Sequence, residues 1–178
     1  MDRHQELKEL IKRDAIKYGK FILSSGQESD FYVDLRKVTL NPKGATLIGS
    51  IIFEMIKDRG IDAIGGMTLG ADPIALATSM IAFQSGYNIS AFIVRKEKKT
   101  HGTSNWMEGP IAQGQRAVVV EDVITTGSST IKAIERIEEA GLKVEMVIAL
   151  LDRMEGGKGA IEALGYKVYS VFSRETLL

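Results

Sequence analysis

The sequence contains no cysteine, and this absence excludes several kinds of site at once. Without thiols, the 178-residue chain can form neither a disulfide scaffold nor a thiolate zinc site, and it has no cysteine nucleophile. Only two histidines are present, His4 and His101, and they lack the spacing of a metal-binding pair. The sequence therefore gives no indication of a disulfide-stabilised or zinc-dependent protein.

An excess of charge of either sign is also absent. The 23 basic and 23 acidic residues give a formal net charge of zero, so no sequence-wide basic field attracts nucleic acid or anionic lipid. No stretch approaches the roughly 18 apolar residues of a membrane span, and the polar first residues do not resemble a signal peptide. We therefore expect a cytoplasmic protein that binds neither nucleic acid nor membranes.

Proline is scarce, with 3 residues, whereas 18 glycines are available for tight turns. The length fits a single domain, which can bury roughly 70% of its unfolded surface. A charged fraction of 26% is ordinary for a globular protein, and the sequence contains no internal repeat, low-complexity tract or linker. We expect one domain over residues 1–178.

Apolar residues alternate between helical and strand spacing along the chain. Helices are predicted at residues 2–17, 41–60, 72–85, 128–140 and 158–164, and strands at 31–34, 61–65, 89–94, 116–122, 144–151 and 166–172. Asn41 and Pro42 are a typical helix start, and Gly60 a typical stop. Strands that alternate with helices favour an α/β fold with a parallel sheet covered on both faces. The connection 96–115 has no period, and its length is typical of a functional segment.

The most informative stretch runs from Val118 to Thr130, where an apolar strand ends in two acids and a turn rich in hydroxyls and glycine leads into a helix. Backbone N–H groups at a helix N-terminus, with Thr and Ser hydroxyls beside them, form a phosphate cradle. Glu121 and Asp122 would repel phosphate, so we expect them to face ribose hydroxyls or a divalent cation reached through water. The plain alternative is a strand–turn–helix with Ser128 as a helix cap.

This stretch resembles the phosphoribosyl pyrophosphate (PRPP) signature of type I phosphoribosyltransferases. Three further motifs resemble the orotate phosphoribosyltransferases of that family: residues 20–36 its N-terminal hood, residues 95–102 its catalytic loop, and residues 151–157 its orotate-binding strand end. Four motifs in order are more specific than the phosphate signature, which purine enzymes share. The resemblance implies a parallel sheet flanked by helices, with a small hood formed by about residues 1–40 and the C-terminal strand.

The resemblance also implies the reaction, namely Mg²⁺-dependent transfer of ribose 5-phosphate from PRPP to orotate in de novo pyrimidine (UMP) synthesis. Mg²⁺ would be held by the substrate and water, with no direct protein ligand. A homodimer with shared active sites is implied, in which the connection 96–114 reaches the neighbouring subunit. Two alternatives stay open: a phosphoribosyltransferase for another base, and a nucleotide-sensing regulator on the same fold.

The family motifs assign a role to each candidate residue. The catalytic residues would be Lys99, His101 and Asp122. PRPP would be bound by Arg95, Lys96, Lys99, His101, Glu121, Asp122, Val123, Ile124, Thr125, Thr126, Gly127, Ser128 and Ser129, and orotate by Lys20, Phe31, Tyr32, Thr125 and Arg153.

Physical chemistry supports the two charged motifs. Residues 95–101 contain four permanent cations and one acid; such a run is often a solvated loop, but cations over a departing pyrophosphate stabilise charge that develops in the transition state. The guanidinium of Arg153 offers a bidentate match to a carboxylate, and its plain alternative is a surface ion pair with Asp152 or Glu155.

Other residues are less decisive. Phe31 and Tyr32 are equally compatible with core packing and with stacking on a planar base, and we interpret Trp106 as a loop anchor. Residues 65–72 should form a loop near the pyrophosphate, with Asp72 as the cap of the next helix. This loop lacks the lysine that many relatives carry there.

Overall fold

A six-stranded sheet forms the centre of the protein in the computed structural model, which describes residues 2–22, 28–97 and 106–178. The strands follow the order β5-β4-β3-β6-β7-β8. They comprise β3 (Ala63–Met67), β4 (Ser90–Val94), β5 (Met107–Glu108), β6 (Arg116–Ile124), β7 (Lys143–Asp152) and β8 (Val168–Ser173). All neighbouring strands are parallel except the short β5, which pairs antiparallel with β4. The predicted parallel sheet is confirmed.

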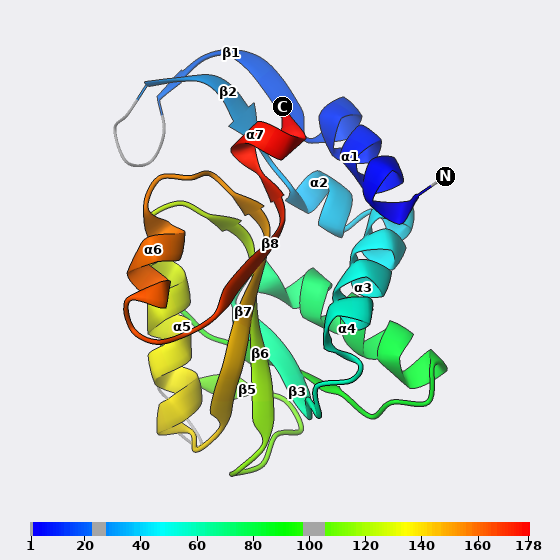
Figure 1. The fold of residues 1–178 in the computed structure, drawn as a ribbon, viewed down its shortest axis with the longest axis vertical. Helices are drawn as coiled ribbons and strands as arrows, with labels where there is room; N and C mark the ends of the chain where they lie inside the picture. The colour runs from blue at the N-terminus through cyan, green and yellow to red at the C-terminus, as the bar shows by residue number, and fades with distance from the viewer. Residues whose placement is uncertain (1, 23–27, 98–105) are drawn as a thin grey trace.

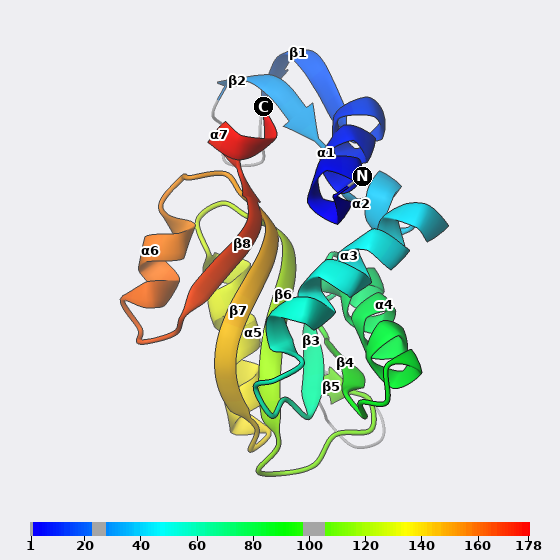
Figure 2. The ribbon, with the colours of Figure 1, turned by 45° about the vertical axis from the view of Figure 1, so that its right-hand side comes forward.

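Helices cover both faces of this sheet. Helices α3 (Pro42–Ile56) and α4 (Ala71–Gln84) lie on one face, and α5 (Ser128–Glu139) and α6 (Gly157–Glu162) lie on the other (Figures 1 and 2). Strand β6 supplies both cores, because its side chains alternate between the faces. Val118 and Val120 pack in the core under α3 and α4, whereas Ala117 and Val119 pack in the core under α5.

The start of α3 follows the sequence prediction. The side chain of Asn41 accepts hydrogen bonds from the backbone N–H groups of Lys43 and Gly44 at 3.0 and 3.2 Å, and Pro42 is the first helical residue. The helix ends at Ile56, and Gly60 follows in the left-handed conformation with φ +63°. Local capping chemistry therefore defines the first helix of the main layer.

A small antiparallel pair of strands stands beyond the carboxyl ends of the central strands (Figure 1). It consists of β1 (Ile16–Ile22) and β2 (Glu28–Val33), preceded by α1 (Arg3–Asp14) and followed by α2 (Arg36–Thr39). Helix α1 is shorter than the predicted span 2–17, because Ile16 already pairs with Val33 in this hairpin. These elements form the N-terminal hood.

The C-terminal strand differs from the expected hood strand. Strand β8 pairs with β7 in the main sheet, and its buried Val168 and Phe172 belong to the two cores. The chain reaches the hood only afterwards, through α7 (Arg174–Leu177). There, Lys8 and Lys12 of α1 donate hydrogen bonds to the main-chain oxygens of Thr176 and Leu178 at 2.5 and 3.1 Å. Among the helices of the described ranges, none has the length and hydropathy to cross a bilayer.

Candidate active site

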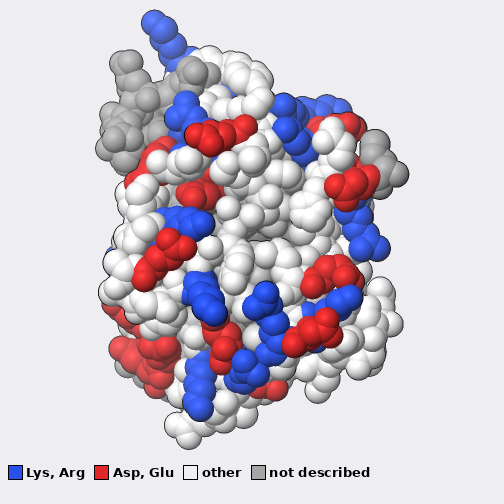
Figure 3. Space-filling model, in the orientation of Figure 1, with Lys and Arg blue, Asp and Glu red and all other residues white. Residues whose placement is uncertain are grey.

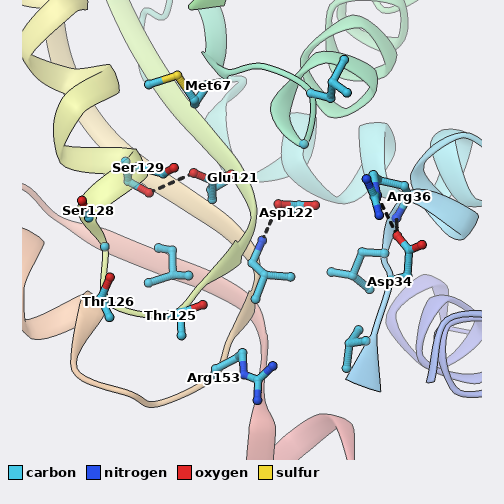
Figure 4. A pocket seen from close by; sticks show the side chains of 18 of the residues that line it. Asp34, Arg36, Met67, Glu121, Asp122, Thr125, Thr126, Ser128, Ser129 and Arg153 are labelled. Atoms are coloured by element: carbon cyan, nitrogen blue, oxygen red, sulfur yellow. Dashed lines mark hydrogen bonds and ion pairs between the residues drawn. The ribbon is translucent and has the colours of Figure 1, made fainter. Parts of the chain in front are cut away.

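A cavity of about 800 Å³ opens at the carboxyl edge of the parallel sheet, below the hood. This edge is where ligands bind in open α/β sheets. The ends of β3, β6 and β7 line it together with the segment after β2 (Figure 4). The lining residues are 32–36, 67–70, 121–130, Lys96 and Arg153.

The turn between β6 and α5 forms one wall of the cavity. Gly127 is left-handed with φ +81°, and a Cβ there would lie 2.8 Å from the carbonyl oxygen of Gly157, so this position requires glycine. Helix α5 begins at Ser128 without a side-chain cap, so the alternative of Ser128 as a helix cap is wrong. Thr126, Ser128 and Ser129 are exposed and line the cavity. A helix N-terminus with free hydroxyls beside it is suited to phosphate.

The two acids at the end of β6 differ in environment. Glu121 is only 7% exposed, and the Thr130 hydroxyl donates to its Oε2 at 3.2 Å. Burial, followed by the nearby charge of Asp122, raises the pKa of Glu121 to about 8. Asp122 is half-buried beside it, and its Oδ1 accepts the Val123 N–H at 2.9 Å. Both line the cavity as expected, but near neutral pH Glu121 is largely a protonated acid.

This donor set bears directly on metal binding. The described residues contain no cluster of three or more His, Asp or Glu side chains that could hold a metal ion. Asp122, half-buried at the end of β6, is the other carboxyl group of the pair that lines the cavity. Such a site suits a hard cation that keeps most of its water and substrate oxygen ligands, as Mg²⁺ does.

Arg153 lies directly after β7 at one end of the cavity (Figure 4). It is 8% exposed, and its Nε pairs with Glu155 Oε1 at 2.8 Å. The expected alternative of an ion pair with Glu155 therefore forms, although it is largely buried rather than on the surface. The ion pair with Glu155 uses only Nε of Arg153. Among the described residues, Nη1 and Nη2 of Arg153 therefore stay available for a bidentate contact with a carboxylate.

The aromatic pair divides between the two predicted roles. Phe31 is 2% exposed and does not line the cavity. Its ring centroid lies 5.2 Å from the guanidinium carbon of Arg153 and 5.0 Å from that of Arg174. Tyr32 is 39% exposed and lines the cavity. Lys20 is exposed on β1, away from the lining residues. Of the hood residues predicted to bind orotate, the structure thus brings only Tyr32 to the cavity.

The charged connection after β4 reaches the cavity through Lys96. Arg95 does not line it, because its Nη1 pairs with Glu108 Oε1 at 3.2 Å. The predicted roles of Lys99 and His101 lie outside the described residues. Trp106, at the other end of the connection, packs against the core under α5, as expected of an anchor.

Two parts of the lining were not among the predicted site residues. Asp34 and Arg36 follow β2 and pair at 2.8 Å, and the hydrogen bond from Arg36 lowers the pKa of Asp34. The available signal was an acid and a base at the end of the predicted strand 31–34 and just after it. Residues 67–70 also line the cavity. The predicted loop 65–72 is shorter than expected, because residues 65–67 belong to β3 and residues 71 and 72 belong to α4.

The expected cap of α4 is wrong. Asp72 is the second residue of the helix, and Gly70 occupies the cap position. The carboxylate of Asp72 instead accepts the Thr68 hydroxyl at 2.7 Å, which ties the loop to the helix.

Comparison with known proteins identifies the family of this chain. The family model described as phosphoribosyl transferase domain matches residues 36–174. An orotate phosphoribosyltransferase of Tropheryma whipplei is 48% identical over 93% of this chain and 78% of its own length. The orotate phosphoribosyltransferase of Aquifex aeolicus is 44% identical over 100% of this chain and 99% of its own length. The chain belongs to the phosphoribosyltransferase family, and within it to the enzymes of the orotate phosphoribosyltransferase group.

Solved structures show the same relationship. The orotate phosphoribosyltransferase of Mycobacterium tuberculosis in complex with Fe(III) dicitrate has a TM-score of 0.88, 41% identity and 99% coverage of both chains. The same enzyme in complex with PRPP has a TM-score of 0.83, 39% identity and again 99% coverage of both chains. The central sheet, its helices and the hood are therefore those of a type I phosphoribosyltransferase.

Proposed function

We propose that this chain transfers ribose 5-phosphate from PRPP to N1 of orotate, giving orotidine 5'-monophosphate and pyrophosphate in de novo pyrimidine synthesis. The observation that carries the proposal is one cavity with a phosphate-binding turn on one wall and the buried guanidinium of Arg153 at its end. A purine has no carboxylate for such a guanidinium. Substrates with this many phosphate charges do not cross a bilayer unaided, so we propose a cytoplasmic reaction.

Different side chains bind different parts of the two substrates. Residues 125–129 hold the 5'-phosphate, Asp122 accepts hydrogen bonds from ribose hydroxyls, and Lys96 faces the pyrophosphate. Arg153 pairs with the orotate carboxylate, and Tyr32 lies beside the base. No covalent nucleophile is needed. The bond from C1' to pyrophosphate breaks through an oxocarbenium-like state, the orotate N1 forms the new bond to C1' from the opposite face, and the N1 proton is lost to water. Catalysis then comes from positioning and electrostatics.

Mg²⁺ is part of this proposal. When present, the ion would supply positive charge that neutralises the leaving pyrophosphate. Asp122, which lines the cavity, would hold the ion through water and the ribose hydroxyls. Glu121, as a largely protonated acid, contributes a hydrogen-bonding group rather than a charge.

We also propose a homodimer with shared active sites, supported by an apolar face on α4. Leu76, Met80 and Phe83 follow helical spacing and are 56%, 56% and 75% exposed. Leu69, 68% exposed, precedes this helix and lines the cavity. An exposed apolar stripe of this kind is typical of an interface, and this one adjoins the site.

A base panel tests the reaction. The protein is incubated with PRPP and Mg²⁺ and with orotate, uracil or hypoxanthine, and pyrophosphate release is followed. We expect pyrophosphate release with orotate and none with uracil or hypoxanthine. Activity with hypoxanthine or uracil but not orotate would refute the proposal.

The alternative of a nucleic-acid-binding regulator predicts association with DNA or RNA that weakens steeply with salt. On the face shown in Figure 3, acidic side chains lie among the basic ones. This mixture favours the enzyme over the regulator, because nucleic-acid binding needs a basic surface.

A further inference from the structure

Arg136 is a half-buried residue of α5 that none of the proposed roles uses. It lies two turns after Ser128, so the helix that begins at the phosphate-binding turn also carries this guanidinium. All its partners among the described residues are neutral groups, and no described carboxylate forms an ion pair with it. A half-buried cation with no counter-charge among the described residues calls for a specific role.

The partners of Arg136 come from both ends of the connection between β4 and β5. Its Nη1 donates to the carbonyl of Arg95, and its Nη2 donates to the carbonyl of Lys96 at 3.3 Å. The guanidinium carbon lies 3.8 Å from the ring centroid of Trp106. The Arg136 side chain thus contacts both Arg95 and Lys96 at the start of the connection and Trp106 at its end.

These two ends are joined to each other as well. The Arg95 N–H donates to the carbonyl of Trp106 at 2.8 Å, which extends the antiparallel pairing of Val94 with Met107. Arg136 therefore lies against a closed base rather than against two independent strands. Its Nη1 also lies 3.6 Å from the sulfur of Met67, a further lining residue of the cavity.

We propose that Arg136 is a positioning residue, which bridges helix α5 to the base of this connection and thereby holds Lys96 at the cavity. The role rests on the proposed function, in which Lys96 faces pyrophosphate. It requires arginine, because a planar guanidinium can stack on a ring and donate in its own plane to two carbonyls at once. A lysine ammonium could keep the charge but not this geometry.

Two variants and two probes test the role. Arg136→Gln removes the positive charge, and Arg136→Lys keeps the charge but not the planar guanidinium. Binding of inorganic pyrophosphate and of ribose 5-phosphate to each full-length variant is measured by calorimetry, with Mg²⁺ present. Lys132→Gln is the matched control, because it removes an exposed cation one turn earlier on the same helix.

We expect both Arg136 variants to bind pyrophosphate about tenfold more weakly or worse, as for the loss of one charge-assisted contact. Ribose 5-phosphate binding should stay unchanged, since residues 125–129 are untouched, and the Lys132 variant should match the wild type. Trp106 is the only tryptophan of the chain, so its emission spectrum should change in both Arg136 variants without any ligand.

Each contrary result has its own meaning. Normal pyrophosphate binding by Arg136→Lys would show that charge alone matters and would overturn the bridging role. An equal loss of both ligands would reveal a general structural role and overturn it too, as would an unchanged Trp106 emission. Wild-type protein that binds neither ligand would refute the proposed function itself.

Discussion

At the scale of single residues, burial decides the protonation of Glu121. Its pKa rises from the ordinary 4.5 to about 8, so the folded protein keeps a proton that the unfolded chain releases above pH 4.5. Wild-type stability should therefore fall relative to Glu121→Gln as the pH rises from about 4.5 to about 8, and the difference should be constant above that range.

Urea unfolding of both proteins between pH 5 and pH 9 measures this difference. Glu145→Gln is the control, because the hydrogen bond from Arg116 lowers the pKa of Glu145. The stability that Glu145 contributes is then complete above pH 4.5, so its difference from the wild type should be flat over the same range. A flat curve for Glu121→Gln as well would contradict a protonated Glu121.

Arg153 and Arg174 form a matched pair for testing orotate recognition. Both guanidiniums pack on the Phe31 ring, but only Arg153 lines the large cavity. Arg153→Ala should weaken orotate binding by about 1.5–3 kcal/mol, or roughly tenfold to over a hundredfold, and leave PRPP binding nearly unchanged. Arg174→Ala should leave both affinities within about threefold. Equal losses for both substrates in Arg153→Ala would place Arg153 outside the orotate subsite.

At the scale of elements, the exposed face of α4 makes a prediction about assembly. Met80→Glu puts a charge into an apolar interface, which is costly unless the charge is paired, so the variant should sediment as a monomer and lose most activity. Leu164→Glu is the control, since Leu164 is equally exposed at 56% but follows α6. A fully dimeric Met80→Glu protein would exclude this face as the interface.

How far the sequence predicts each element depends on whether local or distant contacts decide it. Asn41 caps α3 through its own neighbours, so its role was predictable. The hairpin strand β1 was not predictable in the same way. Ile16 lies within the span 2–17 that was predicted to be helical, and it joins a strand only because it pairs with Val33. The pattern 116–122 predicted a buried central strand, and alternate burial toward two cores confirms it.

The candidate site shows the same division. The turn between β6 and α5 is one continuous segment, so its residue types were sufficient to predict a strand–turn–helix there. Phe31 and Tyr32 could not be told apart, because the choice depends on two arginines that come more than a hundred residues later. The protonation of Glu121 likewise depends on burial by distant segments, which no local motif contains.

At the scale of the whole molecule, a shared site can be tested by mixing subunits. If Lys99 acts in trans with Asp122, exchange between inactive Lys99→Ala and inactive Asp122→Asn chains restores one intact site in each hybrid dimer. Half of the randomly mixed dimers are hybrid, so activity should recover to about a quarter of the wild type. Each variant alone, carried through the same exchange, is the control. No recovery after demonstrated exchange would refute the trans arrangement.

The contact between Gly70 and Asp122 has a consequence for protein engineering. Gly70 has helical backbone angles, φ −61° and ψ −42°, which any residue can adopt. Yet a Cβ there would come within 2.5 Å of Asp122 Oδ1, so the position is restricted by the acid and not by its own conformation. We therefore expect the residue types allowed at positions 70 and 122 to depend on each other. In libraries selected for folded protein, randomising position 70 alone should favour glycine, whereas larger residues should be recovered when position 122 is varied as well.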